Sequence, residues 1–215
     1  MNRRHRETTQ PPSRGLSALV VGLRGIGRQV ALGLASLGVQ KLTLIDAGRV
    51  DPAETATEGY FADDIGRYRR HATAEFCHRL NPGLAIETYA RVSSRDLDPH
   101  TAVLVCGLTP PAEQAVWRQV RGRVAFYGSV HATARAVHVR IAWDPSSKAR
   151  YERWFRRQDA GRRVIARLRP VPLHVAAVAA GLIVLQLSRF LAGRKPASNV
   201  RLDLCTLGLP ARNLA

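Results

Sequence analysis

The chain has 215 residues, enough for one domain with a sizeable buried core. Hydrophobic residues make up 46% and charged residues 23%, and these ordinary globular values exclude a wholly disordered, collagen-like or low-complexity chain. The charge is unusual, because 33 Lys and Arg against 16 Asp and Glu leave a formal net charge of +17. Such an excess indicates an anionic partner, for example nucleic acid, an acidic peptide or an anionic membrane, unless it only reflects an arginine-rich coding bias.

The cysteines and the N-terminal segment indicate where in the cell the protein acts. Cys77, Cys106 and Cys205 are far apart and form no CxxC pair, so the sequence predicts neither a disulfide framework nor a cysteine zinc site, and a cytoplasmic location fits best. Residues 1–15 are basic but lack the apolar core of a secretory signal. We expect a disordered basic arm there, followed by a single domain over residues 16–215.

The first elements form a β-α-β unit. Residues 18–21 (ALVV) are a continuous apolar run, typical of a strand buried in a parallel sheet. The turn GLRGIG follows at residues 22–27. One face of a helix is then indicated by the apolar spacing of Ile26, Val30, Leu34 and Leu37. Residues 41–45 predict a second strand, with Asp46 at its carboxyl end.

The remainder of the chain continues this alternation. Residues 47–67 are polar and rich in turn formers, and predict a long loop. We expect further helices over residues 68–80, 113–120, 149–167 and 172–192, and further strands over residues 84–89, 101–106, 124–127, 136–143 and 200–207. Strands alternating with helices predict an α/β fold with a doubly wound, Rossmann-like, mostly parallel sheet.

The apolar helix over residues 172–192 has its most lipid-like stretch at residues 175–187. That stretch has 13 residues, short of the roughly 20 needed to span a bilayer, so we expect a buried helix and no membrane association.

Positive charge is densest between residues 135 and 170, where eleven Lys and Arg stand against three Asp and Glu. The helix expected over residues 149–167 carries most of it. Trp154 and Phe155 lie beside these arginines and can stack on a base or a peptide. Packing of the two rings onto the sheet is the plainer alternative.

The glycine-rich turn has the form Gly22-x-x-Gly25-x-Gly27 between a strand and a helix. Glycines let the backbone approach a phosphate, and the N-terminus of the helix offers unpaired N–H groups. Asp46 lies 19 residues after Gly27, where the dinucleotide fingerprint places an acid for the ribose hydroxyls. Arg24 stands where the middle glycine of GxGxxG is expected. We therefore predict a nucleotide site at these residues, with a purely structural turn as the alternative.

The stretch LVVGLRGIGRQVALGLASLGVQKLTLIDAGRVDP strongly resembles the ThiF/MoeB family, the ubiquitin-activating-enzyme-like adenylyltransferases. The resemblance continues through residues 62–67 (ADDIGR), 78–82 (HRLNP), 127–131 (YGSVH) and 202–207 (LDLCTL), and covers about residues 16–210. It implies a ThiF-type nucleotide-binding fold, use of ATP and Mg²⁺, and adenylation of the C-terminal carboxylate of a peptide, a ubiquitin-like protein or a tRNA-linked amino acid.

Several family positions are changed in this chain. The resemblance implies that Asp46 is the ribose acid and that Arg69 stands where the family has its phosphate-binding Lys. Family residues Asn, Arg and Gln are replaced by Glu54, Thr57 and Glu58. The two glutamates are expected to repel a triphosphate.

The metal positions are changed as well. Leu108 takes the place of the magnesium-binding Asp, and Arg150 and Arg153 take the places of two zinc-binding cysteines. We therefore expect no zinc and doubtful occupancy by ATP and Mg²⁺. Loss of the phosphate-binding arginine and loss of the metal carboxylate are each expected to lower the rate by ~10²–10³.

The leading hypothesis is a divergent family member, a pseudoenzyme with no catalytic residue of its own. It would act as an accessory subunit in peptide or natural-product modification or in sulfur-carrier activation. Its partner would be an acidic peptide or a small carrier protein, in a homodimer or in a heterodimer with a related subunit.

Two alternatives remain open. An active adenylyltransferase would use Arg24 and Arg69 for the phosphates and Asp63, Asp64 or a partner chain for the metal. An RNA-binding relative would use the positive charge.

The roles of several individual side chains also remain open. Arg24 is either a replacement phosphate ligand or a surface residue, and Arg28 either joins Arg24 and Arg69 in an anion pocket or belongs to a solvated basic face. Cys106 is expected to be a buried thiol rather than a nucleophile. Cys77 and Cys205 are expected to be structural. The histidines share no metal-ligand spacing.

Overall fold

The computed structural model describes residues 15–93, 102–160 and 170–206. The basic arm expected over residues 1–15 lies almost wholly outside the described residues, as do residues 161–167 of the expected basic helix and residue 207 of the expected last strand. The arm and the single domain over residues 16–215 therefore stay predictions.

One sheet of seven strands runs through the described part of the chain, in the order β3-β2-β1-β4-β5-β6-β7. The first five strands in this order are parallel, and β6 and β7 are antiparallel additions at one edge. The mostly parallel α/β sheet is thus confirmed. The strand bounds are β1 Ser17–Val21, β2 Lys41–Ile45, β3 Ala85–Tyr89, β4 Ala102–Cys106, β5 Phe126–Ala132, β6 Ala136–Ala142 and β7 Asn199–Asp203.

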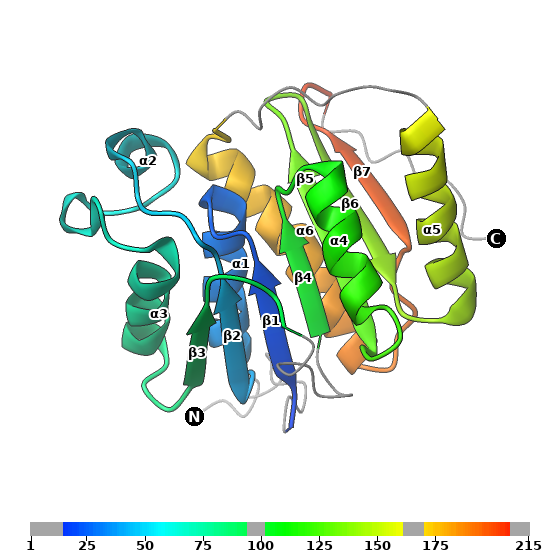
Figure 1. Ribbon diagram of the computed structural model, residues 1–215, viewed down its shortest axis with the longest axis horizontal. Coiled ribbons are helices and arrows are strands. Elements are labelled where there is room, and N and C mark those ends of the chain that lie inside the picture. The colour runs from blue at the N-terminus through cyan, green and yellow to red at the C-terminus, as the bar shows by residue number, and fades with distance from the viewer. Residues whose placement is uncertain (1–14, 94–101, 161–169, 207–215) are drawn as a thin grey trace, which may run out of the picture.

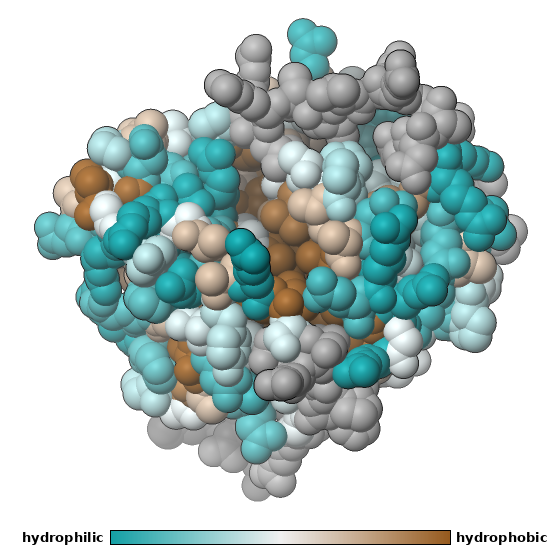
Figure 2. Space-filling view, in the orientation of Figure 1, coloured by the Kyte–Doolittle hydropathy of each residue, from teal (hydrophilic) through white to brown (hydrophobic). Residues whose placement is uncertain are grey.

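Helices cover both faces of the sheet, as a doubly wound fold requires (Figure 1). Helices α1 (Gly25–Leu37), α3 (Arg69–Leu80) and α6 (Leu173–Leu191) lie on one face, and α4 (Pro110–Val120) and α5 (Pro145–Ala160) lie on the other. Each face has its own hydrophobic cluster, because every central strand is buried on both sides and its alternate residues point to opposite faces. Figure 2 shows hydrophilic residues over α5 and a hydrophobic hollow beside α4 on the same side of the molecule.

The glycine loop lies where the winding of the sheet reverses. Strand β1 is flanked by β2 on one side and β4 on the other, so the loop after β1 opens at the crevice between the two halves. Ligands of doubly wound sheets bind at this crevice, outside the carboxyl ends of the strands.

The loop expected over residues 47–67 is wrong in part. It contains helix α2 (Pro52–Thr57) and the 3₁₀ helix η2 (Ala62–Asp64). The polar residues that suggested a loop act as caps: the Asp51 carboxylate accepts a hydrogen bond from Ala53 N, and Glu54 reaches back to Asp51 N. A capping box and a first-turn proline are enough for a short helix.

Several boundaries also differ from expectation. Strand β5 continues five residues beyond Tyr127, so Gly128 lies within the strand and does not end it. A Cβ at Gly128 would come 3.0 Å from Ile183, which leaves little room for a larger residue. Strand β7 ends early, because the Asp203 side chain accepts hydrogen bonds from the backbone of the turn that follows. Helices α4 and α5 begin three and four residues earlier than expected, each at a proline that fits a first helical turn.

Helix α6 is long and apolar enough, by length and composition, to cross a membrane, and it is the one such helix in the described residues. A core helix satisfies the same criterion, and 39% of its most apolar stretch is buried. Its inner side, which includes Ala179 and Ile183, packs against α1 and β5. Its outer side leaves Val178 and Leu185 exposed, so the expected buried helix is confirmed for one side only.

Candidate functional site: the glycine loop and its carboxylate–arginine network

The glycine loop is held in the shape of a nucleotide-binding turn. Gly22 has a φ of 84°, and a Cβ on it would lie 2.5 Å from Cys106 O. A Cβ on Gly27 would lie 1.7 Å from Gly22 O, so no side chain fits where α1 begins. Tyr60 donates a hydrogen bond from its hydroxyl to Leu23 O and fixes the loop from outside. Two of the three predicted glycines are therefore required by packing, whereas a Cβ on Gly25 would make ordinary contacts.

Asp46 lies at the end of β2 as predicted, but protein groups already occupy both of its carboxylate oxygens. Leu23 N donates to Oδ2 at 2.8 Å, and Gly48 N donates to Oδ1 at 2.6 Å. Arg69 also donates to Oδ1 at 3.2 Å. A ribose would have to share or displace these donors.

Glu58 occupies the N-terminus of α1. Its carboxylate accepts a hydrogen bond from Gly25 N at 3.1 Å, the position at which a helix N-terminus favours a bound anion. Arg24 pairs with the same carboxylate, with Nε and a terminal nitrogen at 3.0 and 2.9 Å from Oε1. Burial raises the pKa of Glu58, although the hydrogen bonds from Arg24 act in the opposite direction.

Arg69 holds the second buried glutamate. Its Nε and a terminal nitrogen donate to the two oxygens of Glu54 at 2.9 and 2.7 Å, a bidentate pair in which the Glu54 side chain is 3% exposed. Burial disfavours the charged form of Arg69, but the hydrogen bonds and charges of Glu54 and Asp46 outweigh it and raise the pKa of the guanidinium. Arg69 is thus a structural cation in this structure.

These five side chains form one carboxylate–arginine network: Arg24, Asp46, Glu54, Glu58 and Arg69. Three carboxylates face two guanidinium groups, so the network carries one excess negative charge when all are ionised. Glu54 and Glu58 were expected to repel a triphosphate as free charges. In the structure neither is a free charge, because both are paired with arginines that the sequence suggested as phosphate ligands, and the expected repulsion stays a prediction.

Two further changed positions are Leu108 and Thr57, whereas Arg150 and Arg153 lie on α5, away from the glycine loop. The Leu108 side chain approaches a Cβ position on Gly22 to 3.0 Å, so an apolar group stands over the loop at the place where the resemblance implies a metal carboxylate. The Thr57 hydroxyl donates to Ala53 O within α2. In the described residues no group of three or more His, Cys, Asp or Glu side chains is arranged to hold a metal ion.

Arg28 contradicts both of its expected environments. It is 2% exposed, its Nε donates to Gly59 O at 2.8 Å, and its guanidinium stacks between Tyr60 and Phe76 at 4.7 and 4.8 Å from the ring centres. Burial lowers the pKa of Arg28. It joins neither an anion pocket nor a solvated basic face.

The cysteines largely follow expectation. Cys77 and Cys106 are buried, and burial raises the pKa of both thiols, that of Cys77 to about 12. This supports an inert thiol at Cys106. Cys205 differs, because it is exposed in the turn after β7 rather than packed within a strand.

Sequence analysis missed a second buried cluster, centred on Glu113 of α4. This carboxylate is fully buried, lies 2.6 Å from His131 Nε2 and accepts a hydrogen bond from the Tyr151 hydroxyl. Burial raises the pKa of Glu113, but the hydrogen bonds from His131 and Tyr151 outweigh it and keep the pKa below its usual value. Only the repeated pairing of strands and helices brings these residues together, and no spacing in the sequence indicates it.

The chain belongs to the ThiF family, whose model matches residues 4–209. Its divergence is visible in the network described above.

Curated relatives match over part of the chain. SUMO-activating enzyme subunit 1 of Homo sapiens is 30% identical over 86 residues, which cover 40% of this chain and 24% of that protein. Ubiquitin-activating enzyme E1 2 of Triticum aestivum is 30% identical over 79 residues, which cover 36% of this chain and 8% of that protein. The matches therefore span less than a quarter of the length of these relatives.

Solved structures share the fold. PaaA superposes with a TM-score of 0.72 at 17% identity, covering 95% of this chain and 74% of that one. E. coli MccB bound to ATP gives a TM-score of 0.69 at 15% identity, covering 95% of this chain and 65% of that one. MccB has also been solved with AMPCPP and MccA, and gives a TM-score of 0.70 at 16% identity over 93% of this chain and 64% of that one.

Proposed function

We propose that this protein is an accessory ThiF-family subunit that binds a partner without adenylating it. The partner would be an acidic peptide or small carrier protein that another enzyme modifies. Two similarities support this class of role: MccB is solved together with MccA, and SUMO-activating enzyme subunit 1 is named as one subunit of an activating enzyme.

The observation that carries the proposal is the position of Glu58. Its carboxylate lies on Gly25 N at the start of α1, and Arg24 closes over it. A nucleotide phosphate in this place would meet a resident carboxylate and two arginines that are already paired. Two like charges about 4 Å apart cost ~4 kcal/mol at an effective dielectric of 20, so an incoming triphosphate would have to break the network first.

The test combines ATP–pyrophosphate exchange with calorimetric titration of ATP–Mg²⁺ into the full chain. We expect no exchange and no heat of binding. A triple variant, Glu54→Asn, Glu58→Gln and Leu108→Asp, removes the glutamate partners of both arginines and adds a carboxylate for a metal, and it should gain measurable ATP–Mg²⁺ binding. The charge-matched control is Glu75→Gln, which like the triple variant adds one net positive charge; Glu75 is an exposed surface acid away from the network, and its replacement should gain no binding.

Robust exchange by the unaltered protein, alone or with a candidate acidic partner, would contradict the proposal. It would favour the second candidate, an active adenylyltransferase. One observation favours that candidate: the Arg24 side chain is 41% exposed and has room to turn from Glu58 toward a nucleotide. In that case Arg24→Ala should abolish exchange. In the accessory role it should affect only folding stability.

Association with a second subunit is part of the same proposal. The outer side of α6 carries exposed Val178 and Leu185, which are unusual on the surface of an isolated domain when grouped on one helix. Light scattering after size-exclusion chromatography would distinguish a monomer from the expected dimer.

A further inference from the structure

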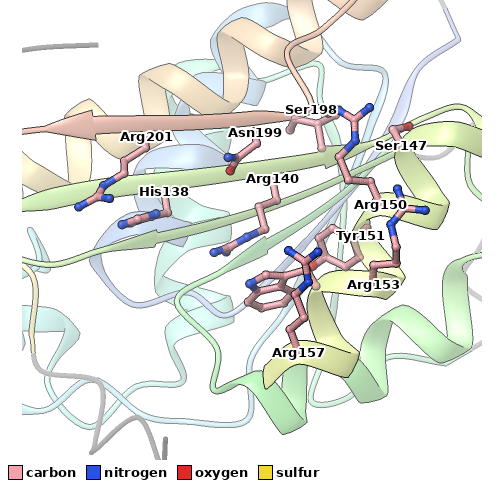
Figure 3. A pocket seen from close by; sticks show the side chains of 12 residues that line it. His138, Arg140, Ser147, Arg150, Tyr151, Arg153, Arg157, Ser198, Asn199 and Arg201 are labelled. Atoms are coloured by element: carbon pink, nitrogen blue, oxygen red, sulfur yellow. Dashed lines mark hydrogen bonds between the residues drawn. The ribbon is translucent and has the colours of Figure 1, made fainter. Parts of the chain in front are cut away.

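A pocket of about 740 Å³ lies between helix α5 and strands β6 and β7, on the side of the sheet away from α1 and α6 (Figure 3). It belongs to the antiparallel edge of the sheet and shares no residue with the carboxylate–arginine network. Its volume is in the range of a small-molecule or short-peptide site. We refer to it as the α5 pocket. Five arginines line it: Arg140, Arg150, Arg153, Arg157 and Arg201.

No acidic side chain is among the residues that line the α5 pocket. The described acids on the neighbouring elements have other partners: Glu152 pairs with Arg121 at 2.8 Å, Asp144 accepts a hydrogen bond from Ser147 N at the start of α5, and Asp203 of β7 accepts hydrogen bonds from Cys205 N and Thr206 N. The buried Glu113 carboxylate is hydrogen-bonded to His131 and Tyr151. The pocket therefore concentrates positive charge, and no carboxylate in the described part of the chain forms an ion pair with its lining arginines.

Arg140 is a partly buried arginine of this pocket. Its guanidinium stacks on Trp154 at 4.0 Å from the ring centre, and no carboxylate of the described residues pairs with it. Burial lowers the pKa of Arg140. Burial, followed by the charges of Arg140 and Arg201, lowers the pKa of the neighbouring His138 to about 4. The lowered pKa of Arg140 reflects burial alone, because the charge of Glu113 acts against it, whereas the effect of Arg140 and Arg201 on the pKa of His138 indicates a positive site that an anion would relieve.

The arrangement suits carboxylates better than nucleobases. Arg150, Arg153 and Arg157 are exposed and recur at intervals of three and four residues, so they project from one face of α5 along the length of the pocket. Guanidinium groups pair with carboxylates in a bidentate fork. The Trp154 ring is already in contact with Arg140, Tyr151 and Phe155, so less of its surface is left for stacking on a base.

We propose that the α5 pocket binds an acidic peptide segment, whose Asp or Glu side chains pair with Arg153, Arg157 and Arg140. The proposal rests on the peptide-binding role given above and locates it on this face. A row of exposed arginines favours an extended segment with several carboxylates over a single small anion. The glycine loop takes no part in this binding.

The probe is a rhodamine-labelled decapeptide of alternating Glu and Ser, with a Gln-for-Glu twin, followed by fluorescence anisotropy on the full chain. We expect the Glu peptide to bind and the twin to bind at least tenfold more weakly. Arg153→Glu and Arg157→Glu should each weaken binding at least tenfold. Arg156→Glu is the matched control, because Arg156 is exposed on the same helix and does not line the pocket, and it should change binding less than threefold.

Three results would overturn the proposal. Equal losses in the Arg153 and Arg156 variants would mean a diffuse field rather than a pocket. Tighter binding of inorganic phosphate or citrate than of the peptide, measured by competition, would assign a small anion. Tighter binding of a decauridine RNA, lost in the Arg153 and Arg157 variants, would assign a nucleic acid.

A second readout keeps the test independent of the folding of the variants. In the unaltered protein, the imidazole of His138 is followed by NMR from pH 3 to 8, with and without the Glu peptide. Binding at the pocket should raise the pKa of His138 by about one unit or more, because carboxylates offset the charges of Arg140 and Arg201. An unchanged His138 titration under saturating peptide would overturn the proposal. Pyrophosphate exchange on the same samples tests the absence of adenylation separately, so either idea can fail alone.

Discussion

The carboxylate–arginine network and the α5 pocket use the same side chain in opposite ways. In the network, Arg24 and Arg69 are paired with three carboxylates that the same chain supplies. In the pocket, five arginines face one another and a histidine, with no acid among the lining residues. The formal charge of +17 therefore does not decide where an anion binds. The placement of the described acids decides it, because Asp46, Glu54 and Glu58 pair with the arginines of the network, whereas no described carboxylate forms an ion pair with the arginines that line the pocket.

The largest expected effect tests whether the shape of the glycine loop, apart from its charges, is still required. Gly27→Ala places a Cβ 1.7 Å from Gly22 O, and we expect a loss of ~3–5 kcal/mol in the free energy of unfolding. Gly181→Ala on the exposed side of α6 meets nothing within 4 Å and should be neutral or stabilising by ~0.5–1 kcal/mol. Urea denaturation measures both. Equal effects of the two substitutions would mean that the loop is no longer constrained.

The next prediction compares one arginine from each region. Arg69→Met removes the bidentate partner of the buried Glu54 carboxylate and leaves only a 3.5 Å contact with Arg24, and the expected loss is ~3 kcal/mol. Arg153→Met removes an exposed cation from a positive pocket, so we expect a change within ~0.5 kcal/mol in either direction. Chemical unfolding of the two variants under identical buffer conditions decides between them. A similar loss at both sites would contradict the distinction between paired and unpaired arginines.

A pH effect follows from His138. Its pKa of about 4 is below the value of an unfolded chain, so protonation favours the unfolded state, and stability is lost as pH falls from about 6.5 through 4. Allowing for partial screening by solvent, we expect a loss of ~2 kcal/mol over this range. His138→Gln should remove that part of the acid-side loss in unfolding titrations. Arg201→Glu should raise the pKa of His138. A His138 pKa near 6.5 would show that the pocket is less positive than its residues suggest.

The smallest effect concerns a surface ion pair that belongs to neither region. Arg121 and Glu152 join α4 to α5 at 2.8 Å, with side chains 55% and 32% exposed. Such pairs contribute little, because solvent screens them and ordering long side chains costs entropy. Arg121→Ala should change the free energy of unfolding by ~0.5 kcal/mol or less in thermal or urea unfolding. A loss above ~1.5 kcal/mol would mean that Glu152 also restrains the wall of the α5 pocket.

Much of the fold was predictable, because hydrophobic periodicity and glycine punctuation report local structure directly. The strand at residues 18–21, the helix after the glycine loop and Asp46 at the end of β2 all lie where the pattern predicted them. Errors fell at residues that are typical of turns but are also found in helix caps or within strands. Asp51 and Glu54 suggested a loop but cap a helix, and Gly128 suggested a strand end but lies in the middle of β5.

The sequence showed which residues are changed at the candidate site, but not how those residues pair with one another. The changes at Glu54, Glu58, Arg69 and Leu108 were visible in the sequence, and they were read as separate defects. Their joint effect was not visible, because the pairs join residues 15 to 34 positions apart and depend on how α2 folds back over the start of α1. The cluster of Glu113, His131 and Tyr151 was missed for the same reason.

The sequence by itself determined the family, most of the order of strands and helices, and the positions at which this chain departs from the family pattern. Those features depend on local periodicity and on residue identity at motif positions, which need no coordinates. Only the tertiary structure decided which arginines are neutralised and which remain uncompensated. Electrostatic pairing depends on distances of a few ångströms between residues far apart in the chain, and packing of the helices on the sheet sets those distances.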